Sequence, residues 1–85
     1  MSATLAGIRQ AVIESVQAIA PEADFAALDP RRPFREELDI DSFDFLNVLI
    51  ELHARLGVEI PEADYGKVGT LEALLGYLAA RLDAH

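Results

Sequence analysis

The sequence contains no cysteine and no tryptophan, and it has only two histidines among 85 residues. Without cysteine, neither a disulfide nor a thiolate metal site can contribute to the fold, and any reactive thiol would have to be brought by a cofactor. Apolar residues make up 52% of the chain. A chain of this length and composition can bury a single core but is too small for a deep catalytic cleft. We therefore expect one domain, residues 1–85, built on one core.

The two histidines give little support to catalysis. His85 is the last residue and is expected to be frayed, whereas His53 falls in the apolar half of a predicted helix, where a partly buried structural histidine is expected. The acidic residues do not form a calcium loop, and no cluster of histidines and acids has the spacing of a zinc site. The sequence therefore predicts neither an active site of its own nor a metal site, and the protein is not expected to be an enzyme.

Long apolar runs are also missing. No apolar segment approaches the roughly 20 residues that a membrane-spanning helix needs. Residues 1–4 lack the basic and apolar regions of a secretory leader. We therefore expect no membrane span and a cytoplasmic location.

Basic residues are scarce in one part of the chain. Residues 36–64 contain nine acidic residues and a single base, Arg55, so that this segment alone accounts for the net charge of −8. The negative electrostatic field of this segment disfavours binding to nucleic acids and anionic membranes and favours binding to basic protein surfaces. Charge alone leaves open the alternative of an ordinary solvated acidic face.

The first half of the chain combines one helix with a long loop. Apolar residues three and four positions apart predict a helix over residues 5–20, which Thr4 caps and Pro21 ends. Residues 21–41 contain three prolines and no sustained apolar period, so they predict a long loop. The side chains expected to pin this loop to the core are Phe25, Leu28 and Phe34.

The second half predicts two further long helices and a short one. Apolar spacing continues over residues 43–56, and Gly57 is suited to end that helix. Residues 62–66 predict one short helical turn, and Thr70 caps a last helix with a stripe of leucines over residues 71–82. The predicted fold is all-α, a small four-helix bundle of three longer helices and one short helix with a long first loop.

Ser42 lies where the long loop meets the second long helix. Asp41 and Ser42 are both residue types that cap helices. Free backbone N–H groups and the positive end of the helix dipole are therefore expected beside the Ser42 hydroxyl, where they would favour a phosphate ester. The alternative is that Ser42 is a plain cap worth about 1 kcal/mol.

A helical wheel separates the faces of the helix that follows Ser42. The apolar half consists of Leu46, Leu49, Leu52, His53 and Leu56. The opposite side carries Asp44, Glu51 and Arg55. A strip along the border of the apolar half contains Phe43, Asn47, Ile50 and Ala54. Phe43 and Ile50 either belong to the margin of the core or form an exposed docking strip.

Several segments follow one recognisable pattern: Phe34, Leu38 and Ile40 to Asp44; Glu51 and Leu52; Leu56 to Glu62; and Val68 to Leu71. Together they resemble the acyl carrier proteins, a family of phosphopantetheine-binding carriers, over essentially the whole chain. In that family the serine of an Asp-Ser-Leu motif is esterified to 4′-phosphopantetheine, which a separate transferase takes from coenzyme A. Ser42 matches that serine, and Asp41 flanks it.

The resemblance also implies a function and a set of partners. Acyl or aminoacyl groups would travel as thioesters on the thiol of the arm, which agrees with a chain that lacks cysteine. The partners would be phosphopantetheinyl transferase and loading and acyl-transferring enzymes with basic docking patches, and the protein is expected to be a free-standing monomer. The residues expected to meet these partners are Phe43, Asp44, Asn47, Ile50, Glu51 and Arg55.

The chain also departs from the carriers of bacterial fatty-acid synthesis. Asp39 stands where many of them have glycine, Phe43 replaces the motif leucine, and Asn47 replaces a common glutamate. His53 and Arg55 stand where those carriers often have a cluster of acidic residues. A bulky Tyr65 lies near the place where family members bury acyl chains, so its ring is expected to shorten or close that pocket. These departures favour a specialised lipid, polyketide or aminoacyl-thioester pathway. The alternatives are the housekeeping carrier of fatty-acid synthesis and a helical interaction module that never carries the arm.

Overall fold

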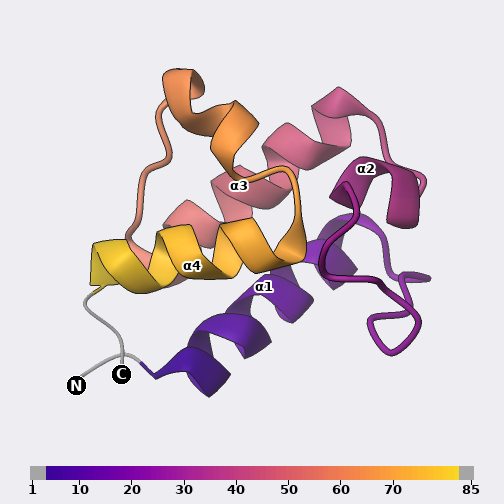
Figure 1. Ribbon diagram of the computed structural model, residues 1–85, viewed down its shortest axis with the longest axis horizontal. Coiled ribbons are helices and arrows are strands. Elements are labelled where there is room, and N and C mark those ends of the chain that lie inside the picture. Colours follow the sequence, from indigo (N-terminus) through magenta and orange to yellow (C-terminus); the bar gives the residue numbers. More distant parts are fainter. Residues whose placement is uncertain (1–3, 83–85) are drawn as a thin grey trace.

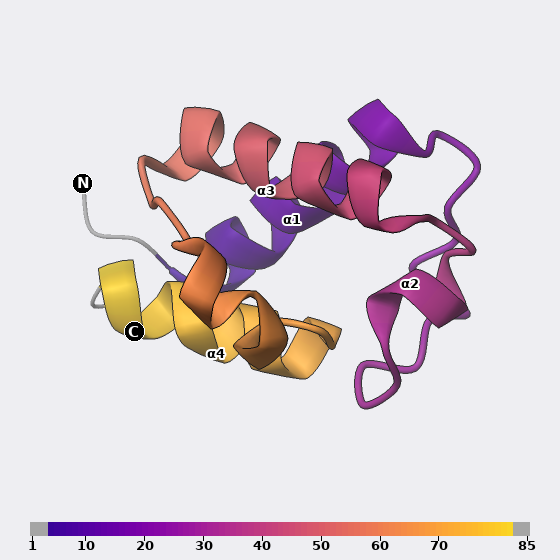
Figure 2. The same cartoon turned by 90° about the horizontal axis from the view of Figure 1, so that it is seen from above.

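The computed structural model describes residues 4–82, so that His85 lies outside the described residues. Over this range the chain is all-α and has no strand, as predicted. The elements in chain order are α1 (Leu5–Ile19), α2 (Phe34–Glu37), α3 (Ser42–Leu56), the 3₁₀ helix η1 (Glu62–Lys67) and α4 (Leu71–Leu82). α1 packs against both α3 and α4, and η1 contacts α4 (Figure 1). α2 and the loop before it lie together at one end of the bundle (Figures 1 and 2).

Local capping explains why the long helices begin and end where the sequence predicts. The Thr4 hydroxyl accepts a hydrogen bond from the amide of Gly7 at 3.0 Å, and the Thr70 hydroxyl accepts one from the amide of Ala73 at 3.1 Å. Gly57 follows α3 with a φ of 72°, a left-handed conformation that glycine adopts without strain. Each cap satisfies a backbone group that the helix end would otherwise leave without a partner.

The core is a single cluster to which every long helix contributes. Its fully buried large side chains are Ile8, Val12, Val16, Leu52, Val68, Leu74 and Leu78. Ser15 is buried among them, and its hydroxyl donates a hydrogen bond to the carbonyl of Ala11 at 2.8 Å. The core therefore contains no unsatisfied side-chain polar atom among the described residues.

The long loop contains one element that the sequence did not predict, the single turn α2. Phe34, the first residue of α2, is only 2% exposed, and its N–H donates to the carbonyl of Gly69 at 2.8 Å. The amide of Glu72 donates to the carbonyl of Pro30 at 2.9 Å. These contacts fasten the loop to the start of α4 and hold four residues in a helical turn that has no apolar period of its own. The prediction of a loop over the whole of residues 21–41 was therefore wrong at Phe34–Glu37.

The predicted anchors hold the rest of the loop to the bundle. Leu28 and Phe34 are buried, and Phe25 is half-buried and packs against the same core. The ring of Phe34 lies 6.5 Å, centroid to centroid, from the ring of Phe45 in α3. The anchors therefore fix the position of the loop at the place where it enters α3.

Candidate modification site at the start of α3

Ser42 is the first residue of α3, and its side chain is exposed. Asp41, and not Ser42, caps the helix: its carboxylate accepts a hydrogen bond from the amide of Asp44 at 2.8 Å, and its carbonyl accepts one from the amide of Phe45 at 3.0 Å. The interpretation of Ser42 as a plain cap was therefore wrong. The Ser42 hydroxyl makes no hydrogen bond with another described residue, so it is accessible for covalent modification.

The backbone around this hydroxyl suits an anion. The amides of Ser42 and Phe43 lie in the first turn of α3, and no described residue accepts a hydrogen bond from either of them. They stand at the positive end of the dipole of a 15-residue helix. A phosphate ester on Ser42 would find N–H donors and a favourable field, so the residues present fit the group that the sequence implies.

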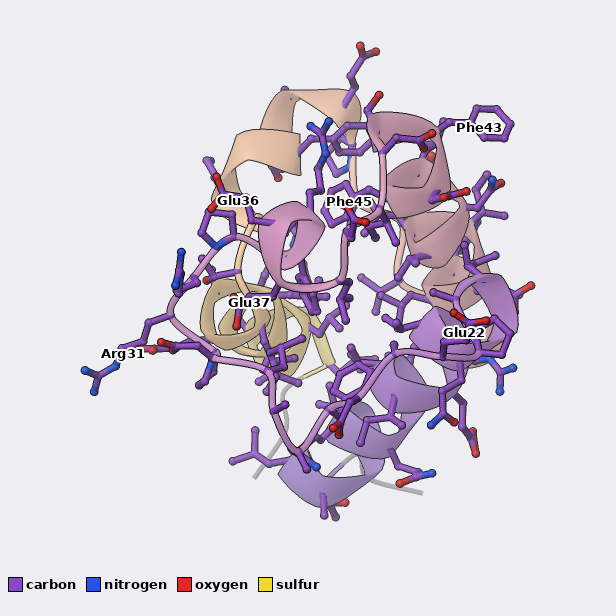
Figure 3. All side chains as sticks on the ribbon, turned by 90° about the vertical axis from the view of Figure 1, so that its right-hand side faces the viewer. Glu22, Arg31, Glu36, Glu37, Phe43 and Phe45 are labelled. Atoms are coloured by element: carbon purple, nitrogen blue, oxygen red, sulfur yellow. The ribbon has the colours of Figure 1, made fainter. Side chains whose placement is uncertain are left out.

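An open hollow of about 660 Å³, which we call the Ser42 hollow, adjoins the serine. Its walls come from α2, from the first turns of α3, from η1 and from the segment after η1. The lining residues are Pro33, Arg35, Ser42, Phe43, Phe45, Leu46, Tyr65, Gly66 and Gly69. Figure 3 shows Phe45 turned into the bundle, whereas Phe43 points away from it. Most of this surface is apolar, as a site for an acyl chain would need to be.

A second hollow of about 140 Å³ lies farther along α3. It is lined by Leu46, Leu49, Ile50, His53, Glu59, Ile60 and Tyr65. Leu46 and Tyr65 line both hollows, so they stand between them. His53 lines this second hollow and is exposed, so the prediction of a partly buried histidine was wrong: the hollow leaves its side chain open to solvent.

The strip along α3 is exposed. Phe43 is 70% exposed and Ile50 is 56% exposed, so these large apolar side chains are not the margin of the core. Leu46, which the wheel placed in the apolar half, is also 36% exposed. Asn47 is half-buried. The alternative of an exposed strip therefore agrees with the structure at Phe43 and Ile50 but not fully at Asn47.

The charged residues predicted for partner contacts do not join this strip. The Arg55 guanidinium lies 3.2 Å from the carboxylate of Glu14 in α1 and 3.5 Å from that of Glu51, one turn earlier in α3. Asp44 is half-buried at the edge of a hollow whose other lining residues come from the end of α1 and from residues 20–40. The six predicted contact residues therefore do not form one surface. Phe43, Asn47 and Ile50 lie on the strip, whereas Asp44, Glu51 and Arg55 lie beside it.

A hydrogen-bonded cluster that the sequence did not reveal ties η1 to α4. The Tyr77 hydroxyl donates to Asp64 at 2.6 Å and accepts a hydrogen bond from Arg81 at 2.8 Å. Lys67 lies 3.2 Å from the same carboxylate. The bond from Tyr77, followed by that from Lys67, lowers the pKa of Asp64, and the same bond raises the pKa of Tyr77. The only local signal was the three-residue spacing of Asp64 and Lys67.

Other kinds of site find no support in residues 4–82. That range contains no group of three or more histidine, cysteine or acidic residues that could hold a metal ion. None of its helices is long and apolar enough to cross a membrane.

The fold and the site define a small helical domain with an exposed serine at the start of a central helix and an apolar hollow beside it. A family model described as "Phosphopantetheine attachment site" matches residues 7–78. An acyl carrier protein of Rubrobacter xylanophilus is 30% identical over 73 residues, which are 82% of this chain and 90% of the relative. One of Thermosynechococcus vestitus is 31% identical over 78 residues, 86% of this chain and 94% of the relative. A meromycolate extension acyl carrier protein of Mycobacterium tuberculosis is 30% identical over 74 residues, 87% of this chain and 60% of that protein.

The chain belongs to the phosphopantetheine-binding family of acyl carrier proteins. Its cofactor is 4′-phosphopantetheine. Members of this family are carriers and not enzymes, and they interact with phosphopantetheinyl transferase and with enzymes that handle acyl groups.

Proposed function

We propose that Ser42 carries the 4′-phosphopantetheine arm and that the chain is a free-standing carrier of acyl or aminoacyl groups. One observation at the start of α3 supports this proposal. Asp41 caps the helix, so the exposed Ser42 hydroxyl has no hydrogen-bond partner among the described residues. The arm would supply a thiol that holds the carried group as a thioester. Ser42 would provide the point of attachment, and the first turn of α3 would stabilise the phosphodiester.

The test is transfer of the arm in vitro. The apo protein, incubated with coenzyme A and a phosphopantetheinyl transferase, should gain the mass of one phosphopantetheinyl group, and Ser42→Ala should gain none. Thr4→Ala is a matched control, because it also removes an exposed hydroxyl at a helix start and should be modified fully. A wild-type protein that gains no mass would favour the alternative of an interaction module that never carries the arm.

We propose further that the carrier serves a specialised lipid, polyketide or aminoacyl pathway and not general fatty-acid synthesis. Carriers meet their enzymes through the helix after the serine, and here that surface combines an exposed Phe43 with a neutral Asn47. Arg55 is already paired with acids of its own chain. The basic patch of a fatty-acid synthase enzyme that recognises a more negative carrier would find fewer counter-charges on this helix. Mismatched charges at an interface weaken and misdirect association.

The test is turnover of the holo protein by a malonyl transferase and a ketosynthase of fatty-acid synthesis. We expect lower rates than with the ordinary carrier of the same organism, and we expect Phe43→Leu with Asn47→Glu to raise them. Gln10→Glu, which adds one charge on the exposed side of α1, is the control and should change nothing. Rates equal to those of the ordinary carrier would contradict the specialised role and favour a role in general fatty-acid synthesis.

Residues 1–85 are proposed to form a single carrier domain that acts as a monomer in the cytoplasm. The support for one domain is the single core shared by α1, α3 and α4. The cytoplasmic location follows from the partners proposed above, because coenzyme A and the transferase act there.

A further inference from the structure

The Ser42 hollow has one charged residue among its described lining residues, and that residue is Arg35. Arg35 lies in the single turn α2, across the hollow from the start of α3. The remaining lining residues are uncharged: apolar side chains, glycines, Tyr65 and Ser42. A lone guanidinium in such a surface needs an explanation, because an acyl chain gains nothing from it.

Arg35 differs from the two other arginines of the same segment. Arg31 lies 3.8 Å from the carboxylate of Glu72, and Arg32 lies 3.8 Å from that of Glu37. Arg35 forms no ion pair or side-chain hydrogen bond with another residue in the range 4–82, although Glu36 is its neighbour in the chain. Its charge is therefore available to an anion that enters the hollow.

A phosphodiester on Ser42 would bring such an anion to the rim of the hollow. It would add a permanent negative charge beside Asp41 and Asp44, within the segment that already carries the whole net charge. The helix dipole offsets part of this repulsion, but its effect is confined to the first turn. Arg35 lines the same hollow as Ser42, and a guanidinium binds phosphate oxygens through two parallel N–H donors.

We propose that Arg35 pairs with the phosphodiester of the arm and directs the arm across the Ser42 hollow. This inference rests on the proposed attachment at Ser42. Arg35 is thus a positioning residue: it holds the near end of the arm and takes no part in thioester chemistry. A carboxylate on the cargo could meet the same guanidinium, but the phosphodiester is favoured because its attachment point lines the hollow.

The experiment compares three holo proteins, the wild type, Arg35→Gln and Arg31→Gln, each with a free thiol on the arm. Arg31 is the matched control, because its side chain is 86% exposed and it points away from the bundle (Figure 3). Both substitutions remove one positive charge from the same segment. The readouts are the ³¹P resonance of the phosphodiester at low and high salt and the change in melting temperature when apo protein becomes holo protein.

We expect the ³¹P resonance of the wild type to move with salt toward the position seen in Arg35→Gln, and Arg31→Gln to behave as the wild type. The gain in melting temperature on attachment of the arm should be smaller in Arg35→Gln by on the order of a few degrees. A fourth holo protein, Arg35→Lys, keeps the charge but loses the paired donors, so both of its readouts should fall between those of the wild type and those of Arg35→Gln.

Equal ³¹P positions and equal melting shifts in all three holo proteins would overturn the inference. A difference that appears only after loading with a dicarboxylic acyl group would overturn it too, because Arg35 would then bind cargo and not the phosphodiester. Failure of the wild type to accept the arm at all would instead count against attachment at Ser42, so that the two proposals fail separately.

Discussion

At the scale of single residues, two neighbours at the start of α3 have different tasks. Asp41 accepts the hydrogen bond that caps the helix, and Ser42 is left exposed with a free hydroxyl. Both are cap residue types, so the sequence alone could not decide which of them caps. Asp39 shows a related effect. It has a φ of 51°, a left-handed conformation that aspartate tolerates better than most residues, and it stands where many fatty-acid carriers have glycine.

This division of tasks predicts how the two substitutions differ in stability. Asp41→Ala should lower the free energy of unfolding by about 1 kcal/mol, because the amide of Asp44 loses its acceptor. Ser42→Ala should change it by no more than about 0.5 kcal/mol, because an exposed hydroxyl without a partner is removed. Urea denaturation of the apo proteins measures both values. A larger loss in Ser42→Ala than in Asp41→Ala would show that the serine caps the helix after all.

At the scale of elements, η1 depends on its side-chain contacts with α4. η1 is a 3₁₀ helix of six residues and contains no buried side chain. Tyr77 and Arg81 in α4 hold Asp64, and the Arg81 guanidinium also lies 4.9 Å from the centre of the Tyr77 ring. Because η1 carries Tyr65, which stands between the two hollows, this cluster also fixes one wall of each hollow.

The cluster predicts a pH dependence of stability. The pKa of Asp64 lies below its ordinary value of 3.8 in the folded protein, because Tyr77 and Lys67 stabilise the carboxylate. Its contribution to stability is therefore complete above about pH 4 and is lost as the pH falls through the lowered value. The pKa of Tyr77 is raised above 10.0, so its contribution holds below that pH and is lost as the pH rises through the raised value.

Unfolding measured as a function of pH tests this cluster. Tyr77→Phe removes the hydroxyl and should weaken the loss of stability in acid, and it should speed amide hydrogen exchange in η1. Tyr65→Phe is the control, because the Tyr65 hydroxyl makes no hydrogen bond with another described residue, and its profile should match that of the wild type. Superimposable profiles for the wild type and Tyr77→Phe would show that the hydrogen bond contributes nothing to the acid transition.

The elements also show what the sequence could and could not predict. The ends of α1, α3 and α4 follow from local caps such as Thr4, Thr70 and Gly57, which the sequence displays directly. α2 depends on a hydrogen bond to Gly69, far along the chain, and therefore left no local signal. The exposure of His53 depends on the hollow that it lines together with residues beyond α3, and a helical wheel of one helix does not contain those residues. The bond from Tyr77 to Asp64 joins residues 13 positions apart and was likewise hidden.

At the scale of the whole molecule, charge is distributed unevenly. Residues 36–64 carry the net charge of −8, in which Arg55 is already counted. Arg32, Lys67 and Arg81, which lie outside the segment, form ion pairs with its acids and offset only part of this charge. Arg55 is among the residues expected to meet partners, but its guanidinium forms ion pairs with Glu14 and Glu51 of this chain. The remaining acids repel one another and leave a negative surface near Ser42.

This repulsion predicts that salt stabilises the fold. The melting temperature of the apo protein should rise between about 0.01 M and about 1 M salt, because the screening length falls from about 30 Å to about 3 Å. Glu36→Gln should raise the melting temperature at low salt and reduce its dependence on salt. Glu22→Gln removes a charge that is also exposed but lies outside the acidic segment, so its effect on the melting temperature should be smaller (Figure 3). A melting temperature that is flat across this range would show that the charges are already compensated.

The most direct test of the account is to locate the modification in the wild-type holo protein. The protein, loaded in vitro with the arm, is digested, and its peptides are fragmented in a mass spectrometer. We expect the phosphopantetheinyl group on the peptide that contains Ser42, with fragment ions that place it on that residue and leave Ser15 and the threonines unmodified. A modification on any other residue, or none at all, would contradict the account.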